Sequence, residues 1–477
     1  MKYLLILPGV LVLLVLIAVV RTLVSPRKTS DYQPPQTDEA EALRLAGKLS
    51  KMIQVDTTSH AGGDDPASFR AFHKTLAELF PRVFSQLEKT EIDGNLLFYW
   101  KGRSREKPIL LMSHQDVVPA EGAWSHAPFS GDIADGKVWG RGASDTKCSV
   151  MAFFEAAEQL LAEGYTPPTD VYLASSCTEE WAGDGAPKLV AELQRRGVEL
   201  FLVCDEGGAI ISEPIGGIPG NFAMVGVFEK GKADVKFTAK STGGHASAPG
   251  KHTPIARLAA FVTEVETHSP FKKKLLPEVA AMFRTLAPYA SSFGLRLLLG
   301  NLWLFAPLLK LVLPAVSAQA GAMLRTTIAF TTQSGSDAYN VIPQEATLGA
   351  NMRFIPHQGE QESLAIIQTL AEKHGLSTEV LHANDFTPPV DIHGEAFTLF
   401  MRVIGETFPG LAASPYVMTG ATDAQFYQPI CKSCIRFAPV IYGPEQMRGM
   451  HGLNENIEYR CLPGAVRFYQ NLIRAEK

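Results

Sequence analysis

Acidic and imidazole side chains stand beside apolar runs or glycine turns at several separate places in the chain. These places hold His114 with Asp116, Asp145, Glu179 with Glu180, Asp205, and His451. The first four groups follow such a run or turn, which is typical of side chains at the carboxyl ends of strands in an open α/β sheet. Because open α/β sheets bind ligands at that edge, the sequence predicts that these side chains form one site for two metal ions.

Two metal ions about 3.5 to 4 Å apart need a carboxylate between them and further imidazole or carboxylate ligands on their outer sides. Asp116 lies two residues after His114 and can accept a hydrogen bond from the free ring nitrogen, which fixes the tautomer. Adjacent Glu179 and Glu180 point in different directions, so one can bind metal while the other moves a proton. This set of residues favours a metal-dependent hydrolase.

The length, composition and net charge of the chain limit its fold class and its partners. A chain of 477 residues with 46% hydrophobic and 19% charged residues is globular, and about two to three domains are expected. The formal net charge of -5 argues against nucleic acid as the main partner. A small molecule or a peptide is the expected substrate.

The six cysteines do not suggest a disulfide framework. Cys148, Cys177 and Cys204 lie on apolar stretches and are expected to be small buried residues. Cys431 and Cys434 form a lone Cys-x-x-Cys, for which a redox role, zinc binding or an oxidised pair stays open.

The N-terminal segment has no charge from Tyr3 to Val20. At about 1.5 Å per residue this run just crosses a hydrocarbon core of about 30 Å. No good small-x-small cleavage site follows, so a membrane anchor is favoured; a cleaved segment would give a secreted protein. Lys2 opposes Arg21, Arg27 and Lys28, which by charge alone would keep the body in the cytoplasm, but an N-terminal export signal favours the periplasmic, lumenal or extracellular side.

The segments between the candidate site residues alternate between strand-like and helix-like patterns. The expected helices are Glu39–Ile53, Phe69–Phe84, Val150–Leu161, Thr253–Thr267 and Gln361–His374. The expected strands are Leu96–Trp100, Ile109–Met112, Asp170–Ser175, Leu200–Val203 and Ala346–Phe354, with Val227–Gly231 and Ala233–Thr238 as a hairpin-like pair.

The chain divides into an anchor or signal segment (1–24), a proline-bearing tether (25–37), and a catalytic domain (38–225 and 386–477) interrupted by an inserted α+β domain (226–385). Within the insert, Leu295–Val316 is apolar but broken by charges and prolines, so it is a poor bilayer span. We expect a helical hairpin packed on the inserted domain; the alternative is a surface that dips into a membrane or guides an apolar substrate.

Six motifs give the chain a specific resemblance to a known family, which covers nearly everything after the tether. They are Ser113–Pro119, Trp139–Asp145, Thr178–Glu180, Gly243–Ser247, Gly420–Ala424 and His451–Asn456. As a set they resemble the co-catalytic zinc metallopeptidases that include acetylornithine deacetylase, glutamate carboxypeptidase, aminoacylase and carboxypeptidase S. The N-terminal segment, the Asp205–Gly208 run and the apolar insert resemble most the branch of carboxypeptidase S and the N-fatty-acyl-amino-acid hydrolases.

The resemblance implies a fold class and a set of roles. The fold is α/β, with a mostly parallel-sheet metallopeptidase domain, an inserted ferredoxin-like lid and dimerisation domain, and here an N-terminal membrane helix. The implied cofactors are two zinc ions, with cobalt or manganese as substitutes, and a homodimer through the lid is the implied assembly. His114 and Asp205 would hold one zinc ion, Glu180 and His451 the other, and Asp145 would bridge them.

The remaining implied roles concern the reaction and the substrate. Glu179 would be the general base, Asp116 would orient His114, and His245 on the lid would stabilise the oxyanion, often from a partner subunit. Asn340, Arg353 and Gly420 would bind substrate, Arg353 and Asn340 by gripping a terminal carboxylate.

Several functions remain open on the sequence. The favoured one is hydrolysis of the amide or peptide bond of N-acyl amino acids or of peptides with a free C-terminal carboxylate. The alternatives are a deacylase for one metabolite, a reversible N-fatty-acyl amino acid synthase and hydrolase, or an inert membrane-tethered binding protein.

Overall fold

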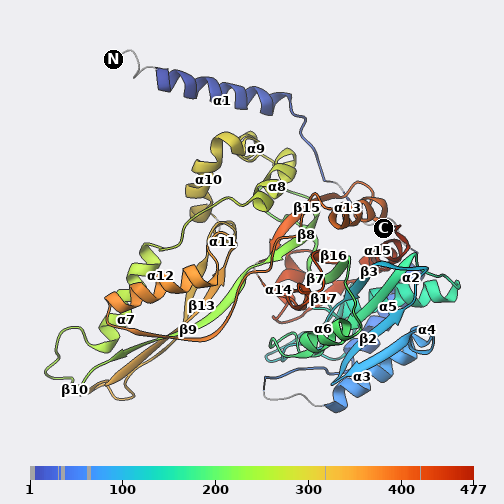
Figure 1. Ribbon diagram of the computed structural model, residues 1–477, viewed down its shortest axis with the longest axis horizontal. Helices are drawn as coiled ribbons and strands as arrows, with labels where there is room; N and C mark the ends of the chain where they lie inside the picture. Colours follow the sequence, from blue (N-terminus) through green and yellow to red (C-terminus); the bar gives the residue numbers. More distant parts are fainter. Residues whose placement is uncertain are drawn as a thin grey trace.

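The larger domain is built around an eight-stranded, mostly parallel sheet (Figure 1). The computed structural model describes residues 6–30, 32–33, 38–61, 66–316, 318–418 and 420–476. In the order in which they lie side by side, the strands are β1 (Glu88–Ile92), β2 (Asn95–Trp100), β6 (Thr169–Ser175), β3 (Ser104–Met112), β7 (Leu202–Ser212), β16 (Cys434–Tyr442), β8 (Asn221–Glu229) and β15 (Ala412–Met418). Parallel pairs join β6, β3, β7 and β16, and β15 is parallel to β8, so the expected α/β class is confirmed.

Helices cover both faces of this sheet because the strands bury apolar side chains on both sides. Leu111 and Leu173 face one core, with α2, α5, α13 and α15, whereas Leu110 and Tyr172 face a second core with α6. The helices of this domain are α2 (Glu39–Ile53), α3 (Pro66–Leu79), α4 (Pro81–Gln86), α5 (Lys147–Ala162), α6 (Gly185–Arg195), α13 (Glu395–Thr407), α14 (Pro444–Gly449) and α15 (Leu462–Arg474), with short 3-10 helices η3 (Asp423–Tyr427) and η4 (Tyr459–Cys461).

The helix expected over Phe69–Phe84 is in fact two helices, α3 and α4, that meet at Phe80. Pro81 is the first residue of α4. Proline has no backbone N–H to continue the preceding helix but suits the first position of a new one, so one continuous helix was the wrong prediction.

The smaller domain has the β-α-β-β-α-β order of a ferredoxin-like fold. Its elements are β9 (Gly231–Lys240), α7 (Pro254–Thr267), β11 (Thr327–Ser334), β13 (Glu345–Phe354), α12 (Glu360–Lys373) and β14 (Ser377–Asn384), and the antiparallel sheet has the order β11-β13-β9-β14. A short ladder of β10 (Gly244–His245) and β12 (Val341–Ile342) lies at its far end (Figure 1).

The hairpin expected between Val227–Gly231 and Ala233–Thr238 is not formed. The chain crosses at Lys230 from β8, in the large sheet, to β9, in the small one. The alternating pattern gave the strands correctly, but it does not encode which partner each strand pairs with. Consequently the large sheet continues to Glu229, beyond the boundary expected at residue 226.

Four helices between α7 and β11 form a separate layer. They are α8 (Pro277–Leu286), α9 (Phe293–Gly300), α10 (Leu302–Val316) and α11 (Ala318–Ala322), with the 3-10 helix η2 (Ala287–Tyr289). Leu299, Leu309 and Leu313 join the core of the larger domain, so the expectation that this segment packs on the inserted domain is wrong. The bend between α9 and α10 is 111°.

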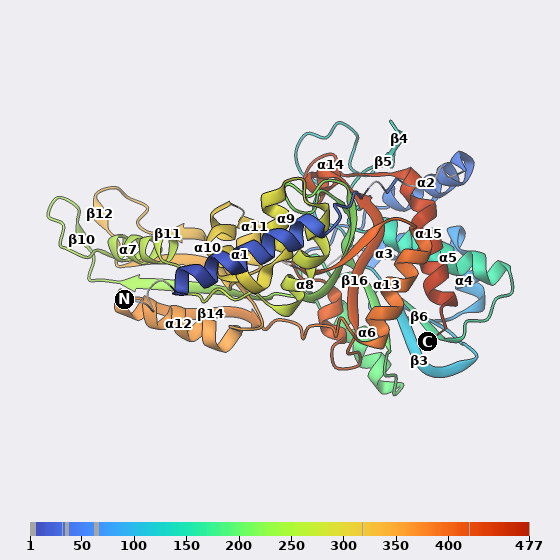
Figure 2. The same cartoon turned by 90° about the horizontal axis from the view of Figure 1, so that it is seen from above.

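The N-terminal helix α1 (Ile6–Val24) lies above α9 and α10 in Figure 1, crosses over them in Figure 2 and contacts both. The first five residues of the expected anchor fall outside the described residues. Within the described chain no single helix is both long and apolar enough to cross a bilayer, whereas the bent pair α9 and α10 passes that test on length and composition.

The segment expected to be a tether is in part fixed to the larger domain. Lys28 donates its backbone N–H to the Pro288 carbonyl at 2.9 Å, and the Tyr32 carbonyl accepts from Asn221 Nδ2 at 3.0 Å. The Tyr32 ring packs edge-on against Phe408. Asp31 and residues 34–37 of this segment lie outside the described residues.

Candidate metal centre

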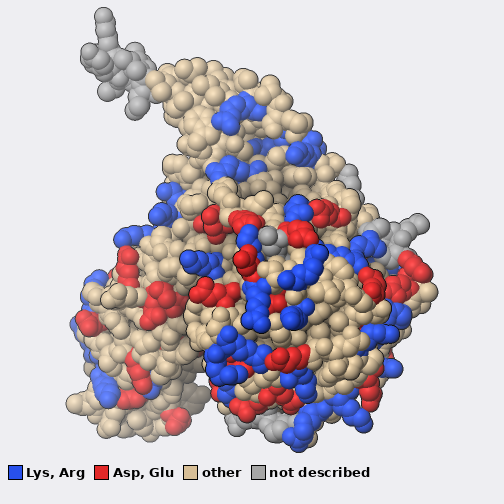
Figure 3. Space-filling view, turned by 45° about the vertical axis from the view of Figure 1, so that its right-hand side comes forward, with Lys and Arg blue, Asp and Glu red and all other residues tan. Residues whose placement is uncertain are grey.

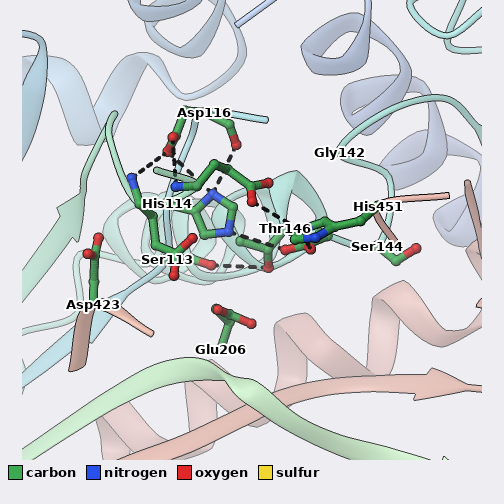
Figure 4. A network of polar contacts seen from close by, with 12 residues as sticks. Ser113, His114, Asp116, Gly142, Ser144, Thr146, Glu206, Asp423 and His451 are labelled. Atoms are coloured by element: carbon green, nitrogen blue, oxygen red, sulfur yellow. Dashed lines mark hydrogen bonds and ion pairs between the residues drawn. The ribbon is translucent and has the colours of Figure 1, made fainter. Parts of the chain in front are cut away.

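Neighbouring strands bring the first candidate residues together. His114 and Asp116 follow β3, Glu179 and Glu180 follow β6, and both of these strands end at the same edge of the sheet because they pair in parallel. Asp145 comes from the turn before α5. His451, from the loop after α14, completes the group in Figure 4.

The centre of the site consists of two imidazoles and two carboxylates. Ligand atoms of His114, Asp145 and Glu180 all lie within 4.8 Å of one another. His114 Nε2 is 3.2 Å from Asp145 Oδ1, and His451 Nε2 is 3.1 Å from Asp145 Oδ2 and 3.0 Å from Glu180 Oε2. Asp145 therefore lies between the two imidazoles, as a bridging ligand would.

Asp116 is buried behind the centre and holds two of its parts in place (Figure 4). Its carboxylate accepts the backbone N–H groups of Glu179 at 3.2 Å and of Glu180 at 3.1 Å, and the Ser59 hydroxyl at 2.6 Å. His114 Nδ1 is 2.9 Å from the Asp116 carbonyl and 3.4 Å from Asp116 Oδ1. These contacts leave Nε2 of His114 directed toward Asp145.

Glu455 fixes the turn that carries Asp145. Its buried carboxylate accepts the backbone N–H groups of Ser144 at 2.8 Å, of Asp145 at 2.9 Å and of Gly142 at 3.1 Å, and it pairs with Arg141 at 2.8 Å. Sequence reasoning assigned Glu455 no role. The signal was its place four residues after His451 within the last motif.

A small three-stranded sheet supports the same connection. It consists of β4 (Ile133–Ala134), β5 (Lys137–Trp139) and β17 (Asn456–Glu458), and β17 pairs antiparallel to β5. The C-terminal part of the chain is therefore held beside the Asp145 turn by a strand pair on one side and by Glu455 on the other.

Asp205 is placed differently from the other expected ligands. It lies inside β7, which continues seven residues beyond it, and not at the end of a strand. Its two carboxylate oxygens accept the backbone N–H groups of Glu206 and Ala424, each at 2.8 Å. Its role as a ligand stays a prediction.

Two further acids, Glu206 and Asp423, lie at the site without a role assigned from the sequence (Figure 4). Glu206 lies in the Asp205–Gly208 run and Asp423 in the Gly420–Ala424 motif, so the resemblance had drawn attention to both segments. Asp423 is buried at the start of η3 and accepts a hydrogen bond from the Ser176 hydroxyl.

The crowding of carboxylates changes their proton affinities. Burial raises the pKa of Glu179 and of Glu206 well above the usual range, raises that of Asp205 to about 6, and raises that of Asp423 to about 7. Burial also raises the pKa of Glu180. Each shift means that negative charge is unfavourable here without a cation.

The imidazoles respond in the opposite sense. Burial lowers the pKa of His114, but hydrogen bonds to Asp116 and Asp145 outweigh it, so the pKa ends well above the usual range. Hydrogen bonds to Asp145 and Glu180 raise the pKa of His451 to about 10. For Asp145, burial raises the pKa, and the hydrogen bonds to His114 and His451 reverse this to a net lowering.

These residues fit divalent metal ions. Imidazole nitrogens and carboxylate oxygens are the ligands that zinc takes in catalytic sites, and two cations would neutralise the surplus of buried carboxylates. Glu180 Oε1 is also buried without a hydrogen-bond partner among the described residues, although buried carboxylate oxygens are normally paired.

The expected substrate-binding residues lie in the smaller domain or on a loop. His245 is exposed on β10 at the far end of the smaller domain, with its Nδ1 2.7 Å from Ser247 Oγ, and Asn340 is hydrogen-bonded nearby through its carbonyl to Ala246 N at 2.9 Å. The single chain does not bring His245 to the metal centre (Figure 1). Gly420 is exposed on the loop between β15 and η3.

Arg353 lies on the polar face of the small sheet. It is directly opposite Lys232 in the β13 and β9 register, and its Nε donates to Asn351 at 3.0 Å. Directly opposite residues share one face of a sheet, so the guanidinium lies on the same side as Lys232. Sequence reasoning did not single out Lys232.

A cleft of about 960 Å³ separates the two domains beside the loop that carries Glu179 and Glu180. On the side of the larger domain it is lined by Trp181, next to Glu180, and by Phe426; on the other side it is lined by Lys232 and Phe386. Aromatic walls with a cation at one side suit a substrate that has an apolar part and a carboxylate.

A sheet edge that combines imidazoles, a shared carboxylate and a free acidic neighbour defines a metallopeptidase or amidohydrolase. The chain belongs to peptidase family M20/M25/M40, whose sequence profile matches residues 110–475.

Similar proteins support this assignment. The chain is 33% identical to the N-fatty-acyl-amino acid synthase/hydrolase PM20D1 of Xenopus tropicalis, over 97% of this chain and 93% of that protein. It is 31% identical to the probable carboxypeptidase S-like 2 of Dictyostelium discoideum, over 98% and 92%.

Solved structures share the fold at lower identity. An M20 family metallo-carboxypeptidase from Sulfolobus solfataricus has a TM-score of 0.67 at 17% identity, covering 90% of this chain and 98% of that one. A dinuclear metal-binding peptidase of the M20 family from Bacillus subtilis has a TM-score of 0.55 at 13% identity, covering 91% and 98%.

Proposed function

We propose that this enzyme uses two zinc ions to hydrolyse the amide bond of N-acyl amino acids, or of peptides, that carry a free C-terminal carboxylate. The observation that carries the proposal is the group of His114, Asp145, Glu180 and His451, with Glu179 beside it, close to the cleft that Trp181 lines. The names of the relatives from Xenopus and Dictyostelium support both an acyl amino acid and a peptide as substrate.

The metal ions would be held by His114, Asp145, Glu180, Asp205 and His451, and Glu206 is a further candidate ligand. When bound, zinc polarises a carbonyl oxygen and makes a water molecule acidic near neutral pH. Cobalt or manganese could replace zinc at such a set of nitrogen and oxygen ligands.

The protein's own groups would supply the proton transfers. Glu179 accepts a proton at its carboxylate as water attacks the amide carbon, and it returns that proton to the departing nitrogen. Asp116 holds the Glu179 backbone and the His114 ring in the required positions. Arg353 and Lys232 attract the terminal carboxylate, and the aromatic wall of the cleft accommodates the acyl part.

Replacement of Glu179 tests the chemistry. Glu179→Gln should keep its metal but lose roughly a hundredfold to ten-thousandfold in turnover, because the amide cannot carry the proton. Metal content by mass spectrometry and hydrolysis of a mixed N-acyl amino acid panel measure the two quantities.

Exposed Glu121→Gln is the matched control and should match the wild type in both assays. Normal turnover in Glu179→Gln would contradict the assigned role. Metal loss in that variant would instead make Glu179 a ligand. A wild-type enzyme that binds metal and hydrolyses nothing would favour the inert binding protein.

Replacement of Arg353 tests the carboxylate requirement. Arg353→Ala should lower kcat/KM roughly tenfold to a hundredfold for substrates with a free carboxylate, because one charge-assisted hydrogen bond is lost. Amide-capped substrates should be affected little. Lys236→Ala is the control, because Lys236 lies on the same face of the small sheet but pairs with Glu379 and is not opposite the cleft-lining Lys232. Equal loss on both substrate types would disprove the role of Arg353.

A reversible reaction is the second candidate. The name of the Xenopus relative includes a synthase activity, and the same groups would act in reverse order during condensation of a fatty acid with an amino acid. Incubation of both products at high concentration, with detection of the conjugate, tests it.

The location and assembly complete the proposal. The uncharged N-terminal run supports attachment to a membrane with the body on the exported side, or secretion if the run is cleaved. The exposed His245 at the far end of the smaller domain supports a homodimer in which it reaches the partner's metal centre. Protease protection in vesicles and sedimentation of the purified protein test these two parts.

A further inference from the structure

The N-terminal helix α1 and two consecutive helices from the insert, α9 and α10, expose apolar side chains together. α1 contacts α9 and α10, and Asn301 Nδ2 donates to Thr22 Oγ1 at 3.0 Å, so the helices form one layer. We call their exposed apolar side chains the apolar face. It consists of Val10, Leu11, Val12, Leu13, Leu16, Ile17, Val20, Leu23, Val24, Phe293, Trp303, Leu308, Leu311 and Val312. An exposed patch of this kind marks a docking surface.

The charge around the apolar face has one sign. Residues 6–30 and 279–336 contain no Asp or Glu, and their charged residues are Arg21, Arg27, Lys28, Arg284, Arg296, Lys310 and Arg325. In Figure 3 the upper part of the molecule accordingly carries basic side chains and no acidic ones, whereas both signs mix below. A basic rim around an apolar surface is complementary to an anionic lipid bilayer.

A pocket lies where α1 meets α8 and α9. It has a volume of about 220 Å³ and is lined by three arginines, Arg21, Arg284 and Arg296, together with Thr22 and Asn301 among others. None of the three guanidinium groups forms an ion pair within the described part of the chain. Arg296 donates to the carbonyls of Thr22 at 3.1 Å and Ser25 at 2.6 Å, which fixes it at the wall.

Three arginine side chains that line one pocket and form no ion pair among the described residues are suited to a phosphate group, which arginine binds through paired N–H donors. The pocket lies at the C-terminal end of α1, so it borders the apolar face. A phospholipid whose chains lie against the apolar face would have its headgroup at this level.

We propose that the apolar face docks on an anionic phospholipid bilayer and that the pocket of Arg21, Arg284 and Arg296 binds the phosphate of a lipid headgroup. This deepens the membrane attachment proposed above, because α1 then acts with α9 and α10 as one lipid-facing layer. The pocket lies outside the metal centre, so the proposal does not depend on the substrate.

Vesicle binding by the full chain tests the pocket. Wild-type protein is mixed with vesicles of phosphatidylcholine alone, or of phosphatidylcholine with phosphatidylglycerol, at fixed salt. We expect tighter binding to the anionic vesicles, and replacement of the three arginines by glutamine should reduce that preference roughly a hundredfold. Binding to phosphatidylcholine alone should fall much less, because the choline ammonium offsets the charge of its phosphate and the apolar face is intact.

The matched control replaces Arg70, Arg103 and Arg195, which lie exposed on the larger domain, by glutamine. It has the same net charge and should keep the full preference. An equal loss in the control, or an unchanged preference in the pocket variant, would overturn the proposal. The double variant Arg21→Gln with Arg284→Gln keeps the Arg296 contacts, and its preference for anionic vesicles should fall roughly thirtyfold. It tests the proposal even if the triple variant misfolds.

A second readout locates the bilayer. Trp303 is 49% exposed on the apolar face, so phospholipids with brominated chains should quench part of the tryptophan fluorescence. Trp303→Phe should lose that part.

If Trp303→Phe is quenched as much as the wild type, the bilayer is not the occupant of the apolar face. If the protein binds no vesicle at all, both the bilayer as occupant and the proposed membrane attachment are rejected. Loss of the anionic preference on adding inorganic phosphate at constant ionic strength would assign the pocket to free phosphate and overturn the lipid assignment.

Discussion

Single residues at the metal centre show what the sequence could and could not predict. The types and order of His114, Asp145, Glu180 and His451 were sufficient to expect one site, and the structure brings these four together. The resemblance singled out Asp205 as a further ligand, which stays a prediction, but the strand pattern alone does not say whether Asp205 or its neighbour Glu206 faces the centre. Successive residues of a strand face opposite sides, and the register of β7 against its neighbours decides which carboxylate faces the centre.

The last motif drew attention to Glu455 but could not give its role, which depends on contacts with backbone N–H groups about 310 residues away. Glu455→Gln should destabilise the protein by about 3 to 5 kcal/mol, since Arg141 would be left buried without its partner. Metal affinity should fall roughly tenfold to a hundredfold, because the Asp145 turn loses its support.

Urea unfolding and metal titration measure the two effects. Glu458→Gln is the control, because Glu458 is exposed three residues later. A variant of Glu455 with wild-type stability would show that the carboxylate is dispensable. Loss of stability without weaker metal binding would show that it supports the fold alone.

At the scale of elements, periodicity predicted most strands and helices of both sheets but not their partners. The step from β8 to β9 illustrates this, because two alternating segments separated by one residue enter different sheets. Lys230 at this step is 2% exposed and donates to the carbonyls of Ala322 and Arg325, each at 3.0 Å. A hydrophobic pattern marks apolar residues as buried, so it could not predict that a lysine is buried at this junction.

This lysine gives a prediction about pH. Burial lowers the pKa of Lys230 from 10.5 to about 7. Between these two values the unfolded chain binds more protons than the folded one, so the free energy of unfolding rises with pH across this window, by up to about 1.4 kcal/mol per unit. Below about pH 7 both states are protonated and the slope ends.

Lys230→Met should flatten that slope. Urea unfolding at several pH values above neutrality measures it, with Lys240→Met as the control because Lys240 is 73% exposed at the other end of β9. Equal slopes in the wild type and in Lys230→Met would mean that the lysine stays charged in the folded protein.

At the scale of the whole molecule, the arrangement of the two domains sets the cleft and separates His245 from the metal centre of its own chain (Figure 1). The pattern of strands and helices predicted an inserted domain, but not the packing of α9 and α10 on the larger domain. The same helices also contact α1, which lies more than 250 residues earlier in the chain. No local pattern records such a contact.

His451 and Glu455 come late in a chain of 477 residues, whereas the groups that they complete are made much earlier. The strands β1, β2, β3, β6 and β7 are synthesised long before β16 and His451, so a nascent polypeptide can form that half of the large sheet before it holds all of its metal ligands. The metal centre is completed only once His451 has been synthesised. A chain that stops before His451 would also lack α15, whose buried side chains belong to the core of the larger domain, so it would lose part of the fold together with the last imidazole.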